Sequence, residues 1–64
     1  MNNIDELRKK KGLSYKKIAA KAGVSGQYIW LLAKGKRSNP SLKSMQKIAA
    51  ALGETVDHVF QVAQ

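Results

Sequence analysis

Residues 15–34 read YKKIAAKAGVSGQYIWLLAK, and this stretch decides the fold. Ser25 is a good N-cap for a helix, and Gly23 just before it tolerates the positive φ angle of a tight turn. Two short helices that meet at a steep angle also need a small residue where their backbones approach, and Ala19 supplies it. The stretch therefore predicts two helices joined by a short turn, the second of them over residues 25–34.

Small and apolar residues keep a fixed spacing along this stretch. Counted from Tyr15 as position 1, they fall at positions 4, 5, 9, 10, 15 and 18. The residues at these positions are Ile18, Ala19, Gly23, Val24, Ile29 and Leu32. Ile18 and Val24 pack the corner between the two helices, and Ile29 and Leu32 anchor the second helix to a core. A pattern that fixes both size and polarity indicates a helix-turn-helix over about residues 15–34.

The residues before this motif predict one more helix. Ile4 and Leu7 share one of its faces, and Gly12 is a suitable C-terminal stop. Asn3 followed by Glu6 has the spacing of a capping box, in which each residue satisfies a backbone N–H of the other. We therefore expect a first helix that begins just after Asn3.

The residues after the motif predict a loop and two further helices. Two cations and three turn-forming residues make up the loop 36–40. A fourth helix begins at Ser41, and a last, short one begins at Thr55. The apolar residues of the fourth helix recur with a 3-4 spacing: Leu42, Met45, Ile48, Ala49 and Leu52. We expect one all-α domain over residues 1–64, a compact bundle of five short helices without a separate effector domain.

Charge is distributed unevenly along the chain. Twelve Lys and Arg against four Asp and Glu give a net charge of +8. Residues 1–47 carry all twelve cations and two of the acids, a net +10, whereas residues 48–64 carry only Glu54 and Asp57, a net −2. Such a basic region is expected where one face of a protein meets a polyanion. Charge alone would also fit a membrane surface or a generally basic soluble protein.

The composition argues against several classes of protein. With no cysteine, one histidine and four carboxylates, we expect neither a metal site nor a cofactor. Asp5 and Glu6 are adjacent in a helix and diverge, and His58 has no evident partner, so we do not expect an enzyme. No apolar run approaches the roughly 20 residues of a membrane span, and the N-terminus lacks the apolar region of a signal peptide. We therefore expect a cytoplasmic protein.

The sequence resembles the phage-repressor and Cro-type helix-turn-helix family, also called Xre-like. The resemblance covers residues 7–60 and is carried by GLSYKKIAAKAGVSGQYIWLLAKGK, NPSLKSMQKIAAALG and TVDHVF. It implies a lambda-repressor-like DNA-binding domain in which the helix 25–34 enters the major groove of double-stranded DNA. It also implies a nucleoid-associated homodimer that regulates transcription, usually as a repressor on an inverted-repeat operator. A phage or mobile-element repressor, a Cro-like protein and an antitoxin-like autoregulator all fit it.

By this resemblance, the first turn of the helix 25–34 faces the DNA bases. The expected base contacts are Ser25, Gly26, Gln27, Tyr28 and Leu31. Gln27 is the best candidate for direct readout because its amide can pair with N6 and N7 of adenine. The alternatives are a solvated helix residue for Gln27 and a half-buried core tyrosine for Tyr28.

Phosphate contacts are expected from both ends of the motif. The candidates are Arg8, Ser14, Tyr15, Lys16, Lys36, Arg37, Ser38, Asn39 and Lys43. The start of the second helix adds free amides and the positive end of a helix dipole. The family usually has Gln where Tyr15 stands, and a Glu that pairs with Arg8 where Ala33 stands, so we expect Arg8 to be free for a phosphate. The remaining lysines considered are expected to be a solvated basic face: Lys9, Lys10, Lys17, Lys21 and Lys47.

Two apolar features remain. Trp30 follows Ile29 and so lies off the buried stripe; we favour packing within the protein, with a dimer partner or the DNA backbone as alternatives. The apolar residues of the tail are expected to form a dimer interface or, alternatively, to finish the monomer core: Val56, Val59, Phe60 and Val62. A protein-interaction module, such as an antitoxin-like or anti-repressor partner, is the alternative function, although it would not require the basic loop 36–40.

Overall fold

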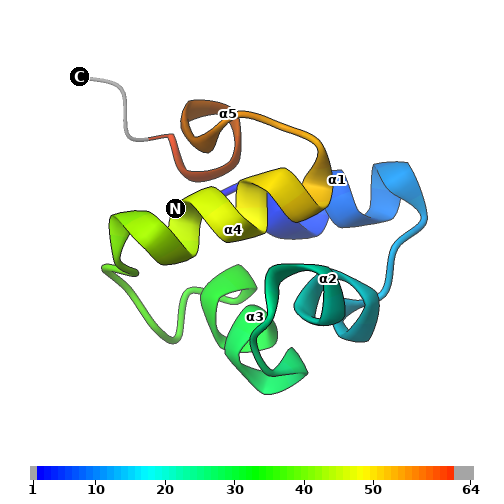
Figure 1. Cartoon of the computed structure of the whole chain (residues 1–64), viewed down its shortest axis with the longest axis horizontal. Coiled ribbons are helices and arrows are strands. Elements are labelled where there is room, and N and C mark those ends of the chain that lie inside the picture. The colour runs from blue at the N-terminus through cyan, green and yellow to red at the C-terminus, as the bar shows by residue number, and fades with distance from the viewer. Residues whose placement is uncertain (1, 62–64) are drawn as a thin grey trace.

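Five helices make up residues 2–61, the part of the chain that the computed structural model describes (Figure 1). They are α1 (Ile4–Lys11), α2 (Tyr15–Ala22), α3 (Gly26–Ala33), α4 (Leu42–Leu52) and α5 (Val56–Phe60). Residues 2–61 contain no strand. The all-α prediction and the predicted order of five helices are confirmed.

A serine or threonine side chain caps the N-terminus of four of the helices. The Oγ atoms of Ser14, Ser25 and Ser41 accept the backbone N–H three residues on, at 3.0 to 3.1 Å. Thr55 does the same for α5 at 3.1 Å. Each cap satisfies one of the N–H groups that a helix leaves unpaired in its first turn. The local sequence alone therefore sets where α2 to α5 begin.

The start of α1 differs from the predicted capping box. Asn3 makes no side-chain cap, because its Nδ2 donates instead to the backbone oxygen of His58 at 2.8 Å. Asn2 takes its place, since its Oδ1 accepts the N–H of Ile4 at 3.1 Å. The capping-box prediction is wrong because a tertiary partner from α5 competes for the asparagine.

The core lies between the helices and is entirely apolar. Its buried residues are Ile4, Leu7, Ile18, Ala19, Ala22, Ile29, Leu32, Ile48, Ala49, Leu52, Val59 and Phe60. The helix α4 runs through the middle of the molecule, with α2 and α3 on one side and α5 on the other (Figure 1). Because α2 packs against both α3 and α4, the first helix of the motif is fixed from two directions and can serve as the platform for α3.

The C-terminal apolar residues close this core. Val59 is fully buried and Phe60 is 8% exposed, while Val56 is half-buried and packs against the core. The backbone N–H of Asn3 also donates to the oxygen of Val59 at 2.7 Å. The prediction of a dimer interface is therefore wrong for Val59 and Phe60, which finish the monomer core; Val62 lies outside the described residues.

Two further properties concern residues 2–61. Within them, no helix is long enough and apolar enough to cross a membrane. The same residues hold no group of three or more histidine, cysteine, aspartate or glutamate side chains that could bind a metal ion.

Candidate nucleic-acid interface

The N-terminal turn of α3 is partly open to solvent. Ser25 and Gln27 are exposed, while Tyr28 and Leu31 are half-buried. Gly26 lies close to the start of α2: a Cβ built on it would be 3.9 Å from the Cα of Lys16. The starts of α2 and α3 are therefore adjacent, and the positive ends of two helix dipoles lie near one another.

The loop after α3 returns to the side of Tyr28. Backbone N–H groups of Lys36 and Arg37 both donate to the oxygen of Leu31, at 2.9 and 3.2 Å. These bonds hold the loop against the last turn of α3. The guanidinium of Arg37 lies 5.1 Å from the centre of the Tyr28 ring. A cation predicted to contact phosphate thus stands beside a residue predicted to contact bases.

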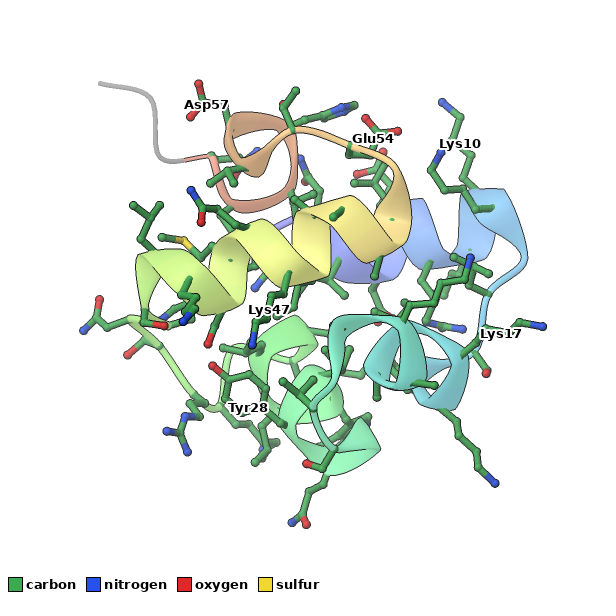
Figure 2. The ribbon with its side chains drawn as sticks, in the orientation of Figure 1. Lys10, Lys17, Tyr28, Lys47, Glu54 and Asp57 are labelled. Carbon is green, nitrogen blue, oxygen red and sulfur yellow. The ribbon has the colours of Figure 1, made fainter. Side chains whose placement is uncertain are left out.

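The other expected phosphate contacts lie at the surface. The side chains of this set are exposed: Ser14, Lys16, Lys36, Ser38, Asn39 and Lys43. Asn39 has a φ of +56°, which turns the chain into α4. In the view of Figure 2, Lys47 projects from α4 toward the side on which α3 lies. Lys47, predicted to be only a solvated lysine, therefore lies on the side of the molecule where α3 is.

Arg8 and Tyr15 are not free for phosphate. Arg8 Nε pairs with Asp5 Oδ1 at 3.0 Å, and its Nη1 donates to the oxygen of Leu13 at 3.1 Å. The guanidinium also lies 4.4 Å from the centre of the Tyr15 ring. Tyr15 donates its hydroxyl to the same Asp5 oxygen at 2.6 Å. The prediction of a free Arg8 is wrong because an acid one turn earlier in α1 pairs with it.

A third partner of Asp5 comes from the end of α3. Lys34 Nζ lies 2.7 Å from Asp5 Oδ2. Hydrogen bonds, first from Lys34 and then from Tyr15, hold the pKa of Asp5 far below its ordinary value; burial opposes them, and Arg8 lowers the pKa further. This Asp5 cluster (Asp5, Arg8, Tyr15 and Lys34) was not predicted. The spacing of Asp5 and Arg8, three residues apart in a helix, was the available sequence signal.

A second charged cluster joins the end of α1 to α5. Glu54 pairs with Lys11 Nζ at 3.2 Å and with His58 Nδ1 at 2.7 Å. Lys11, followed by His58, lowers the pKa of Glu54. Figure 2 places Glu54 and Asp57 beside α5, away from Tyr28 on α3. The acids of the C-terminal region therefore do not oppose the basic loop, and His58 has a partner that the sequence did not reveal.

Trp30 keeps part of its surface in solvent. It is 38% exposed, and among the described residues the only other exposed large apolar side chain is Leu42, at 60%. The favoured interpretation of packing within the protein therefore holds for only part of the Trp30 side chain.

Known proteins share this sequence and this arrangement of helices. The family model described as "Helix-turn-helix" matches residues 4–59. The HTH-type transcriptional regulator y4dJ of Sinorhizobium fredii, itself described as uncharacterized, is 40% identical over 58 residues, which are 91% of this chain and 71% of that protein. The HTH-type transcriptional regulator SinR of Bacillus subtilis is 36% identical over 53 residues, 83% of this chain but only 48% of SinR.

Solved structures agree with the sequence comparison. A crystal structure of SinR, "the master regulator for biofilm formation", in complex with DNA superposes with a TM-score of 0.77 at 36% identity, over 83% of this chain and 84% of that one. A SinR–SinI protein complex gives a TM-score of 0.77 at 35% identity, over 84% of this chain and 52% of that one. This chain therefore spans about half of full SinR.

Proposed function

This chain belongs to the helix-turn-helix family, and from that premise we propose that it is a DNA-binding transcriptional regulator that inserts α3 into the major groove. The observation that carries the proposal is the surface around α3. Gln27 is exposed in its first turn, and Arg37 stands over the neighbouring Tyr28. An exposed amide for base readout beside a basic loop for phosphates is what such a protein needs.

The proposed base contacts are those of the first turn of α3. Gln27 pairs with a base edge, while Ser25, Gly26, Tyr28 and Leu31 face the groove around it. The proposed phosphate contacts retain the exposed candidates: Ser14, Lys16, Lys36, Arg37, Ser38, Asn39 and Lys43. Tyr15 and Arg8 leave this set because both are engaged by Asp5. Lys47 joins it, since it projects from α4 toward the side on which α3 lies (Figure 2).

The regulator is proposed to act as a repressor on an inverted repeat. One short recognition helix makes few base contacts, so specificity usually comes from two half-sites about 34 Å apart that bind a dimer. The buried Val59 and Phe60 leave the dimer contact to other surfaces. Trp30 and Leu42 are the large apolar side chains still exposed among the described residues. A strict monomer in sedimentation, both free and on its operator, would contradict the dimer.

The remaining features of the proposal follow from DNA as the partner. A protein that binds DNA in this way needs neither cofactor nor catalytic activity, and the relatives are described as transcriptional regulators. Its location is the cytoplasm, in association with the nucleoid. We propose a single helix-turn-helix domain over residues 1–64, since the family match spans residues 4–59.

Binding to a protein is the second candidate function. The similarity to the SinR–SinI complex supports it, because a protein that contains a matching domain there forms a complex with another protein. A partner-binding role does not need the exposed cations of residues 36–39, which favours DNA.

Selection from a random DNA duplex pool at two salt concentrations tests the proposal. The bound fraction is sequenced, and enrichment of an inverted repeat with half-site centres about one helical turn apart is expected. Salt-sensitive binding without enrichment would mean that the basic surface is real but that α3 does not read bases, and would favour the protein-partner role. Absence of binding at low salt would overturn the DNA-binding proposal altogether.

A further inference from the structure

We propose that Asp5 is a positioning residue for DNA recognition: it fixes the C-terminal end of α3, and so the angle at which the other end of α3 meets the DNA. This proposal rests on the proposed DNA-binding function. It assigns to an acid of the first helix a role that net charge would not suggest, since removing an acid from a DNA-binding protein ordinarily strengthens binding.

The argument begins with where α3 is held. At its C-terminal end, Lys34 Nζ lies 2.7 Å from Asp5 Oδ2, and the backbone oxygen of Leu32 accepts Asn2 Nδ2 at 2.7 Å. Both contacts come from the N-terminal segment of the chain. At the other end, the exposed Gln27 faces outward. The end of α3 away from the proposed groove is therefore the end that these polar contacts hold.

The Asp5 carboxylate also joins three elements at once. Its Oδ2 pairs with Lys34, and its Oδ1 accepts both the hydroxyl of Tyr15, the first residue of α2, at 2.6 Å and Arg8 Nε of α1 at 3.0 Å. One carboxylate thus sets α1, the start of α2 and the end of α3 relative to one another. Without it, Arg8 and Lys34 would be neighbouring cations with no acid between them.

The length of α3 turns a small change at one end into a lost contact at the other. Eight helical residues make a rod about 12 Å long, so a tilt of about 5° at the held end moves the far end by roughly 1 Å. A hydrogen bond from an amide tolerates about half of that. Asp5 therefore affects base readout at Gln27 without touching DNA.

The cluster has a second effect on the interface. It engages Lys34 and Arg8 with an internal acid and turns the Tyr15 hydroxyl inward. Three donors that would otherwise be available to phosphates anywhere along a duplex are withheld. Loss of the carboxylate should therefore raise binding to random DNA while it lowers binding to the best site.

The decisive experiment compares Asp5→Asn with Glu6→Gln. Glu6 is an exposed acid on the next position of the same helix, so both variants remove one negative charge from nearly the same place. Dissociation constants are measured for the selected site and for a random duplex, well below the unfolding temperature. We expect Asp5→Asn to lower the ratio of specific to random affinity about fivefold, ~1 kcal/mol, while Glu6→Gln leaves the ratio unchanged.

A second pair of variants tests the α3 end of the contact. Lys34→Gln and Lys10→Gln each remove one exposed cation, but Lys10 points away from α3 at the other side of the molecule (Figure 2). Lys34→Gln should lower the ratio of specific to random affinity, and Lys34→Arg should keep it near the value of the unaltered protein. Lys10→Gln should weaken binding to both DNAs equally. If the cluster only stabilises the fold, Asp5→Asn and Lys34→Gln should lower the unfolding temperature but leave the ratio of specific to random affinity unchanged.

Amide hydrogen exchange on the free protein tests the positioning without any DNA. The N–H groups of Gly35 and Lys36 donate to Leu32 and Leu31 at the end of α3. Asp5→Asn should speed their exchange about fivefold more than Glu6→Gln, because the end of α3 loses its tether. Unchanged exchange together with an unchanged ratio would overturn the Asp5 proposal alone. Absence of DNA binding by the unaltered protein would instead overturn the proposed function, and exchange would then show only whether Asp5 holds the end of α3.

Discussion

At the scale of single residues, the proposed interface separates readout from attachment. Gln27 is exposed at the start of α3 and carries an amide that can recognise one base. Arg37 lies over the ring of the next residue, Tyr28, and carries a charge that any phosphate attracts. The two side chains are therefore close together but should differ in what their loss does to binding.

Gln27→Ala and Arg37→Ala form a matched pair of predictions. Gln27→Ala should cost about 1–3 kcal/mol on the best site and change the preferred base at one position. Arg37→Ala should weaken binding to every sequence and make the slope of log K against log salt shallower by roughly one. Titrations of the selected site and its single-base variants at several salt concentrations measure both. An equal loss on all sequences for Gln27→Ala, or an unchanged slope for Arg37→Ala, would remove that residue from its proposed role.

At the scale of elements, the turn between α2 and α3 requires a left-handed backbone conformation at one residue. Gly23 ends α2 with a φ of +75°, and a Cβ there would meet nothing within 4 Å. Gly26 begins α3 without a positive φ, and its nearest neighbour would be the Lys16 Cα at 3.9 Å. The two glycines lie three residues apart, but only the position of Gly23 requires a conformation that other residues rarely adopt.

Replacement of each glycine by alanine should shift stability in opposite directions. Gly23→Ala should destabilise the fold by about 1–2 kcal/mol, because an L-residue is strained in the left-handed region. Gly26→Ala should stabilise it by up to ~1 kcal/mol, because alanine restricts the unfolded chain and fits the helix. Thermal unfolding of both variants measures the effects, at roughly 4–8 °C per kcal/mol for a domain of this size.

The same Gly26→Ala variant also examines the interface. If it is more stable but binds the selected site more weakly, Gly26 lies against the DNA; if binding is unchanged, the glycine is merely tolerated in the first turn. Destabilisation by Gly26→Ala, or tolerance of Gly23→Ala, would contradict the described geometry of the turn.

At the scale of the whole molecule, two carboxylates join elements that are distant in sequence. Asp5 connects α1 to α2 and α3, and Glu54 connects Lys11 at the end of α1 to His58 in α5. The pKa of each carboxylate is lowered, from ordinary values of 3.8 and 4.5. A lowered pKa means that the ionised group stabilises the folded state, fully above the ordinary pKa and less and less as the pH falls through the lowered one.

Acid should therefore weaken the fold through these two groups. We expect the free energy of unfolding to fall as the pH drops below about 4.5, and the double variant Asp5→Asn/Glu54→Gln to show a flatter dependence. Urea unfolding between about pH 3 and pH 7 at constant ionic strength measures it. Glu6→Gln, outside both clusters, serves as the control. A double variant with the same pH dependence as the unaltered chain would show that the two clusters do not contribute.

The burial of Phe60 in the monomer core leads to a prediction about assembly. Phe60 is 8% exposed and lies in the core, whereas Leu42 is 60% exposed. Phe60→Ala should therefore destabilise the fold by about 3 kcal/mol or more, and the midpoint of unfolding should not depend on protein concentration. Leu42→Ala should leave the stability of the monomer nearly unchanged. A folded Phe60→Ala variant that only loses a dimer would return this residue to the interface.

The resemblance to the phage-repressor and Cro-type family is confirmed by the match over residues 4–59. The signals that predicted the fold act over a few residues. Ser14 and Ser25 cap the helices that follow them, and Ile29 and Leu32 recur at the helical period and are buried. Such patterns depend on the geometry of one helix or one turn, so they can be found without knowledge of the rest of the chain.

Only the tertiary structure decided which side chains meet across helices. Asp5 and Lys34 are 29 residues apart, and no local sequence pattern connects them. Arg8, predicted to be free for phosphate, pairs with this same acid. The apolar pattern of Val59 and Phe60 in the sequence fits a monomer core and a dimer interface equally well, so the sequence alone could not distinguish the two. Helical period shows that one face is buried, whereas the packing of the five helices determines what covers that face and which charges it brings together.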